Sequence, residues 1–159
     1  MAGDLAGKKV SESQTEISQL VIPQYANLFG TVHGGAILSM ADSVAYVCAA
    51  RHAGPRCVTV SVDRVDFREP VRIGELLIFK ASVNYTGRTS IMVGIKILAE
   101  DLKTGHKRHT NSCYFTFVSL DENDRPKPVP RIIPETEEEK RRYAESEARH
   151  KADRERFRK

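Results

Sequence analysis

The feature that most constrains the fold is one long apolar segment, GAILSMADSVAYVCAARH, at residues 35–52. Written as a helix, it places apolar residues on nearly every side, and the breaker pair Gly54-Pro55 follows its end. A helix of this kind is normally buried on most sides. The rest of the chain must therefore supply the surfaces that cover it.

The segments around this helix show the alternation that is typical of half-buried strands. Five strands are predicted, at about residues 15–22, 57–67, 75–86, 90–101 and 107–120. The alternation of the second strand slips after Val62, which predicts a bulge or bend. Strands that follow one another favour an antiparallel meander. The predicted class is α+β, with an antiparallel sheet of five to six strands wrapped around one central helix, and its free edge predicts a dimer.

The two ends of the chain differ in composition from the domain at 15–120. Residues 1–14 are small and polar, without the apolar stretch of a secretory signal, and are expected to be disordered. Residues 121–159 begin as a proline-rich linker and continue from Glu135 as a charged helix, with Thr136 and Glu139 at capping-box spacing. Its apolar face is thin (Tyr143, Ala144, Ala148, Phe157), which favours a solvated helix over one that packs on a neighbouring subunit.

Composition narrows the location and the partners. The three cysteines, Cys48, Cys57 and Cys113, have no CxxC spacing, which indicates a reducing, cytoplasmic compartment. They are expected to lie in the hydrophobic core. No apolar run is long enough to span a membrane. The net charge of +4 fits an anionic small-molecule ligand. The C-terminal tail mixes both signs of charge and no helix-turn-helix precedes the domain, so no nucleic-acid partner is expected.

Two features of the central helix point to chemistry. Gly34 and Gly35 stand at its start, where unpaired N–H groups can stabilise an oxyanion, although the pair also suits a plain tight turn. Asp42 lies two turns further on, and Ser39 and Tyr46 fall on the same stripe. A carboxylate in such a groove can act as a general base or as a nucleophile, and an exposed aspartate on the one wet edge of the helix is an equally good interpretation.

Each of the other candidate site residues is a weaker signal when taken by itself. Asn27 can orient a water or a carbonyl, or be a simple turn residue. His33 precedes the glycine pair, and the turn Gly87-Arg88-Thr89-Ser90 joins two long strands, with Arg88 able to meet a phosphate. There is no GxSxG elbow, P-loop, Rossmann fingerprint or metal-ligand spacing, so neither a metal nor a separate cofactor is expected.

In combination, the segments ANLFGTVHGG, MADSVA, VTVSVDRVDFREPVRIGE and YTGRTSI resemble the hot-dog fold acyl-CoA thioesterases. The likeness covers about residues 15–135 and is to the acyl-coenzyme A hydrolase branch, with its brain-type cytosolic enzyme and small bacterial relatives. It implies a hot-dog homodimer whose sheets join edge to edge, assembled further as a trimer of dimers. CoA would enter as part of the substrate.

The resemblance also implies roles for particular residues. Asp42 matches the catalytic carboxylate, Asn27 the polar residue supplied by the partner subunit, and Gly34 with Gly35 the groups that polarise the thioester carbonyl. The turn from Gly87 to Ser90 matches the CoA path, and we group His33 with it as a candidate CoA contact. The implied reaction is hydrolysis of acyl-CoA to a free fatty acid and CoA. The alternative is a hot-dog protein that binds acyl-CoA without catalysis.

Overall fold

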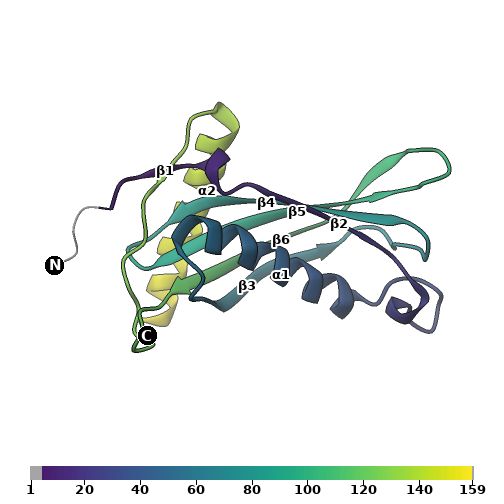
Figure 1. Cartoon of the computed structure of the whole chain (residues 1–159), viewed down its shortest axis with the longest axis horizontal. Helices are drawn as coiled ribbons and strands as arrows, with labels where there is room; N and C mark the ends of the chain where they lie inside the picture. The colour runs from purple at the N-terminus through teal and green to yellow at the C-terminus, as the bar shows by residue number, and fades with distance from the viewer. Residues whose placement is uncertain (1–4, 159) are drawn as a thin grey trace.

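The computed structural model describes residues 5–158, and its main layer is a five-stranded antiparallel sheet with a helix on each face (Figure 1). The sheet has the order β2-β4-β5-β6-β3. Helix α1 packs on the face that carries the core, and helix α2 crosses the other face. The elements are β2 Thr15–Leu20, α1 Gly34–Ala53, β3 Cys57–Phe67, β4 Leu76–Thr86, β5 Ser90–Glu100, β6 Lys107–Ser119 and α2 Glu137–Phe157.

The expected central helix and five strands are confirmed. The buried positions of α1 interdigitate with alternate apolar residues of β4, β5 and β6, because successive strand side chains point to opposite faces. This core is made by Ile37, Ala41, Val44, Ala45, Cys48 and Ala49 of the helix with Phe79, Val83, Val93, Ile95, Phe115 and Phe117 of the sheet. The helix stops at Gly54, whose φ of 99° favours glycine.

The strand order departs from a simple meander. Strands β4, β5 and β6 are consecutive neighbours, but β3 pairs with β6 at the far edge of the sheet. The free edge of β4 is taken by β2, so β3 joins the sheet at its other side. Strand β3 contains the expected bulge, between Asp63 and Asp66, and a second one between Thr59 and Ser61.

The expectation of disorder before residue 15 does not hold for Lys8–Glu12. Strand β1, Lys8–Lys9, pairs in parallel with β7, Ile132–Ile133, and a 3₁₀ helix follows at Val10–Glu12. The side chain of Val10 is 4% exposed, so this segment is held by the core as well as by backbone bonds. Residues 1–4 lie outside the described residues.

The C-terminal helix packs on its own chain, against the expectation of a solvated helix. Its capping box is confirmed, with the Thr136 hydroxyl accepting from the Glu139 N–H and the Glu139 carboxylate from the Thr136 N–H. The Tyr143 ring meets Tyr85 at 5.1 Å, and the Arg149 guanidinium lies 3.8 Å from the centre of the Tyr114 ring. The thin apolar stripe of the sequence did not predict this contact, because polar and aromatic side chains make it.

The three cysteines are free and buried, as expected. Burial raises the pKa of the Cys48 and Cys113 thiols to about 12, so both stay protonated at neutral pH. Among residues 5–158, no helix combines the length and apolarity that crossing a membrane requires.

Candidate functional site

The start of α1 holds the first part of the candidate site. His33 precedes the helix, and its Nδ1 accepts a hydrogen bond from the Gly35 N–H at 3.0 Å. The His33 ring also fills the space that a Cβ on Gly35 would need, at 2.9 Å, which accounts for the glycine. Within residues 5–158, no acceptor receives the Gly34 N–H. Gly34 is therefore the donor left open at the positive end of this helix.

Asn27 shapes the loop that leads to the helix. Its Oδ1 accepts from the N–H groups of Phe29 and Thr31, and its Nδ2 donates to the Thr31 hydroxyl at 2.9 Å. The backbone continues the same connection, because the His33 N–H bonds to the Tyr25 carbonyl at 2.8 Å. Asn27, His33 and Gly34 thus lie on one hydrogen-bonded connection that leads into α1. Inside one chain, the Asn27 side chain acts as a turn residue.

Asp42 lies further along α1, on the side that the core leaves open. It is half-buried, and its neighbours on that side, Ser39, Ser43 and Tyr46, are exposed. Its Oδ1 accepts a hydrogen bond from the Thr59 hydroxyl of β3 at 2.7 Å. This contact fixes one oxygen of the carboxylate and leaves the second free of protein donors within the described residues.

Thr59 is a candidate site residue that sequence reasoning missed. In the sequence it is one position of an alternating strand, without any mark of its own. The register shift between Thr59 and Ser61 distorts the strand beside it, and bulges often re-aim side chains near active sites. The alternation from Val58 to Val62 is unbroken, so the sequence gives no signal for Thr59.

The predicted site residues do not meet inside one chain. Asp42 lies eight residues after Gly34 on the same helix, which is a rise of about 12 Å. A single thioester carbonyl is too small to reach both groups. The turn of Gly87, Arg88, Thr89 and Ser90 lies at the end of β3 opposite to Gly34. Ser90 pairs with Val118 and Val118 with Val58 at one end of β3, whereas Gly34 packs against Phe67 at the other end.

A cavity of about 260 Å³ opens beside Gly34. The ring of Phe67 forms one side, with its Cζ 3.3 Å from the place of a Cβ on Gly34. Apolar side chains make most of the wall, and two charged residues stand among them. The lining is Val32, Gly34, Ile37, Phe67, Arg68, Glu69, Pro70 and Val71.

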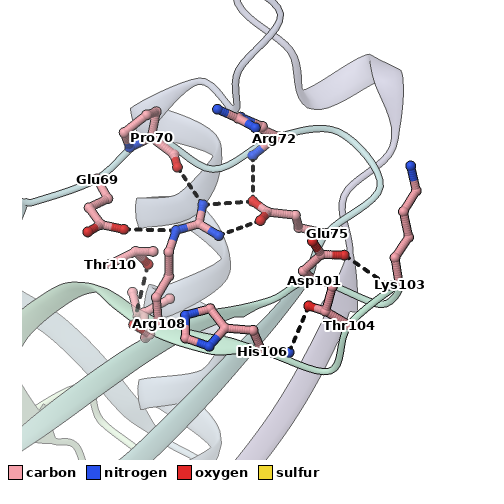
Figure 2. A network of polar contacts seen from close by, with 11 residues as sticks. Glu69, Pro70, Arg72, Glu75, Asp101, Lys103, Thr104, His106, Arg108 and Thr110 are labelled. Carbon is pink, nitrogen blue, oxygen red and sulfur yellow. Dashed lines mark hydrogen bonds and ion pairs between the residues drawn. The ribbon is translucent and has the colours of Figure 1, made fainter.

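Arg108 of β6 clamps the loop that forms the outer wall of this cavity (Figure 2). Its guanidinium binds the carboxylates of Glu75 and Glu69 and the carbonyl of Pro70. Glu75 also accepts from the Arg72 N–H at 2.8 Å. The hydrogen bonds from Arg108 hold the pKa of Glu75 below its ordinary value. Arg108 is therefore engaged by carboxylates and does not add free positive charge for a ligand.

A larger cavity, of about 620 Å³, lies between α2 and the outer face of the sheet. Its floor is polar and its rim carries both signs of charge, including Lys80, Lys96, Glu138 and Arg142. None of the predicted site residues lines it. It is therefore separate from the groups that carry the predicted chemistry.

Two exposed apolar surfaces flank the candidate groups. Val58, Val60 and Val62 of the edge strand β3 are 43%, 54% and 43% exposed. At the tip of the Asn27 loop, Leu28 and Phe29 are 99% and 89% exposed. Apolar side chains gathered on an edge strand and a loop tip are typical of a surface that another protein covers.

The described fold agrees with the comparisons with known proteins. The model of the Thioesterase superfamily matches residues 29–106. Protein VdlD of Helicobacter pylori is 52% identical over 127 residues, which cover 80% of this chain and 72% of VdlD. The cytosolic acyl coenzyme A thioester hydrolase of Mus musculus is 36% identical over 143 residues, covering 89% of this chain and 38% of that enzyme.

Solved structures are similar over nearly the whole length. An apo-hexameric acyl-CoA thioesterase is 37% identical, with a TM-score of 0.91, covering 96% of this chain and 98% of its own. The acyl-CoA hydrolase of Staphylococcus aureus, solved with butyryl coenzyme A and coenzyme A, is 35% identical with a TM-score of 0.88, covering 94% and 92%. This chain belongs to the thioesterase superfamily, and within it to the hot-dog fold acyl-CoA thioesterases.

The Staphylococcus aureus enzyme has also been solved with an asparagine, an aspartate or a threonine replaced by alanine. In that enzyme the aspartate follows the asparagine by 15 residues, and the threonine follows the aspartate by 17.

Proposed function

We propose that this protein hydrolyses acyl-CoA thioesters, at a composite site made by Asp42 of one subunit and the helix start of another. The observation that carries the proposal is the half-buried Asp42 carboxylate, bound by Thr59 and facing away from the core. Asn27, Asp42 and Thr59 have the same separations, 15 and 17 residues, as the three residues replaced in the Staphylococcus aureus enzyme. That match supports their assignment to one site.

Two chains are needed because of the distance along α1. Pairing of two β3 edges in an antiparallel dimer would place the Phe67 end of one strand opposite the Cys57 end of the other. The helix start of one subunit would then approach Asp42 and the Gly87–Ser90 turn of the partner subunit. This arrangement also covers the exposed valines of β3 and the apolar loop tip. Each dimer would hold two equivalent sites.

The groups brought together at this site can carry out the hydrolysis of a thioester. The thioester carbonyl oxygen accepts a hydrogen bond from the Gly34 N–H, which stabilises the negative charge that develops on it. Asp42 of the partner subunit takes a proton from a water molecule as its oxygen attacks the carbonyl carbon. Asn27, on the loop that leads to Gly34, orients that water. The tetrahedral intermediate then expels the CoA thiolate, which is a good leaving group.

Direct attack by Asp42 is the alternative for the same site. It would form an acyl anhydride on the carboxylate, which water then hydrolyses. A single turnover in ¹⁸O-labelled water tests for the anhydride. Label in the Asp42 side chain, visible by peptide mass spectrometry, requires an anhydride that water attacks on the enzyme side, whereas attack on the thioester or on the acyl side of an anhydride labels only the fatty acid.

The first test is release of free thiol from acyl-CoAs of increasing chain length, followed with a disulfide reagent, for wild type and Asp42→Ala. All three cysteines of the protein are buried, and a reaction without acyl-CoA gives the background from them. We expect the release to collapse in Asp42→Ala while the circular dichroism spectrum stays that of wild type. Equal release by both proteins, or none by wild type, would instead favour a protein that binds acyl-CoA without catalysis.

Assembly and location are part of the same proposal. The hexameric state of the similar thioesterase supports a trimer of dimers built on the β3 edge. The name of the mouse relative supports a cytoplasmic location. Sedimentation of the purified protein would distinguish a dimer from a hexamer.

A further inference from the structure

We propose that Arg108 is a positioning residue for the hydrolysis, and that it holds the Gly34 N–H where the thioester carbonyl meets it. The inference rests on the proposed function, in which this N–H stabilises the developing oxyanion. Within residues 5–158, the guanidinium of Arg108 bonds only to the loop at residues 68–75. Arg108 therefore acts on Gly34 through that loop and not by contact.

Arg108 grips the loop at three points. Two of its nitrogens bind the Glu75 carboxylate, a third binds Glu69 at 2.9 Å, and one of the three also donates to the Pro70 carbonyl at 2.7 Å (Figure 2). A guanidinium can do this because its N–H groups form a rigid planar fork. The Glu75 side chain is 12% exposed, so solvent and salt screen this pair less than a surface pair. The clamp therefore fixes the geometry of the loop as well as its charge.

The clamped loop supports the segment that leads into α1. The Val71 carbonyl accepts a hydrogen bond from the Val32 N–H at 2.8 Å. Next to this bond, Arg72 and Thr31 form an antiparallel bridge. The side chains of Val32 and Val71 are 7% and 1% exposed, so the junction is packed as well as hydrogen-bonded. Since Val32 precedes Gly34 by two residues, a shift of the loop moves the start of α1 with it.

The other end of the loop also reaches Gly34. The ring of Phe67 lies with its Cζ 3.3 Å from the place of a Cβ on Gly34. The residue after it, Arg68, donates its backbone N–H to the Thr110 carbonyl of β6 at 2.9 Å. Gly34 is thus held from two sides by a loop that is fastened to β6 at Arg108 and Thr110.

The position of the Gly34 N–H affects the rate as strongly as its presence does. An oxyanion donor acts at about 2.7–3.1 Å from the oxygen that carries the charge. A misplacement of about 1 Å costs about 10²-fold in rate. Because the negative charge develops only in the transition state, a displaced donor lowers kcat and leaves KM nearly unchanged.

The test is Arg108→Lys, which keeps a positive charge beside Glu75 but cannot bind Glu75, Glu69 and the Pro70 carbonyl together. We expect kcat to fall by about tenfold or more and KM to change by less than about twofold. Arg142→Lys is the control, since it makes the same change in an Arg–Glu pair of α2, on the other face of the sheet. It should keep the kcat and KM of wild type.

A second variant covers the case in which Arg108→Lys does not fold. Glu69→Gln loosens one contact of the same clamp, at a side chain that is 51% exposed. It should lower kcat in the same direction by a smaller factor. Thermal unfolding and light scattering show whether each variant keeps the fold and assembly of wild type at the temperature of the assay.

The sharpest measurement combines Arg108→Lys with Gly34→Pro, which removes the N–H itself. If Arg108 acts through that N–H, the double variant is no slower than Gly34→Pro alone, because no donor is left to position. Losses in kcat that multiply in the double variant would overturn the inference, since Arg108 would then act elsewhere. A wild-type kcat in both Arg108→Lys and Glu69→Gln, or a KM that rises while kcat holds, would overturn it as well.

These outcomes separate the positioning role from the proposed function. If wild type releases no thiol from any acyl-CoA, the proposed function fails and the role of Arg108 fails with it. If wild type is active but the losses of the two substitutions multiply, the hydrolysis stands and only the positioning role of Arg108 is removed.

Discussion

Asp42 and Gly34 can take part in chemistry because their neighbours leave one carboxylate oxygen and one N–H group without a hydrogen-bond partner in the described part of the chain. Thr59 binds one oxygen of the Asp42 carboxylate, and the rest of that helix face carries exposed residues without apolar burial. His33 caps the Gly35 N–H and leaves the Gly34 N–H as the free donor. A buried carboxylate without partners would cost several kcal/mol, so this half-open setting is what allows the helix to carry Asp42 at all.

The Gly34 N–H can be deleted without removing the helix. Gly34 is the first residue of α1, where proline is tolerated because that N–H has no helical partner, and His33 before it already has the extended backbone that proline requires. We expect Gly34→Pro to lower kcat by about 10²–10³-fold, the usual effect of losing one oxyanion donor. Steady-state thiol release measures it.

Gly34→Ala is the matched control, since it keeps the N–H and adds a similar contact with the Phe67 ring. It should retain most of the activity that Gly34→Pro loses. Equal loss in both variants would mean that the Phe67 contact, not the N–H, is what matters at this position.

At the scale of elements, the loop clamp of Arg108 makes stability depend on pH. Glu75 has its pKa held below the ordinary value of 4.5, chiefly by the hydrogen bond from Arg108. A carboxyl group with a lowered folded-state pKa stabilises the fold above its unfolded pKa, and that stability is lost as the pH falls through the folded value. Stability supplied by Glu75 should therefore be complete above about pH 5 and decline below about 4.5.

The measurement compares thermal unfolding between pH 7 and pH 3 for wild type and Glu75→Gln. The variant should unfold at lower temperature at pH 7, and the difference should shrink towards pH 3. Glu122→Gln, at an exposed turn, is the control and should follow wild type throughout. A difference that stays constant with pH would show that the ion pair does not set the stability of this loop.

The helices and strands also show how far the sequence predicts the structure. Helix α1 and the five strands are predicted because burial imposes clear periods, 3.6 on a helix and 2 on a strand. The place of β3 next to β6 depends on which sheet edge is free, which no local pattern encodes. The docking of α2 was missed because Arg149 on Tyr114 and Tyr143 on Tyr85 leave no apolar stripe. Thr59 was missed because its role depends on the contact between β3 and Asp42 of α1, which no local pattern encodes.

For the whole molecule, the exposed edge of β3 predicts an obligatory assembly. Val60 is 54% exposed in the single chain, so Val60→Lys costs the isolated fold little but places a charge on the surface that a partner would cover. We expect this variant to be a folded monomer by light scattering and to lose nearly all thioesterase activity. Leu102→Lys is the control. It also replaces an exposed apolar residue with lysine, at 55% exposure in the turn after β5, and it should keep both assembly and activity.

A monomeric Val60→Lys protein with full activity would place the whole site in one chain. An oligomer that survives the substitution would remove the β3 edge from the interface. Either result would contradict the way in which the exposed apolar residues are explained here.

The most direct test of a site shared between subunits is complementation between two inactive variants. Asp42→Ala and Gly34→Pro are produced alone and co-expressed in equal amounts, and thiol release is measured per subunit. In a mixed dimer, one site combines the two intact groups and the other combines the two defects. Since half of the dimers are mixed, we expect co-expression to restore about a quarter of wild-type activity. If the co-expressed protein is no more active than the mean of its two parents, Asp42 and Gly34 do not act across subunits, and the composite site is wrong.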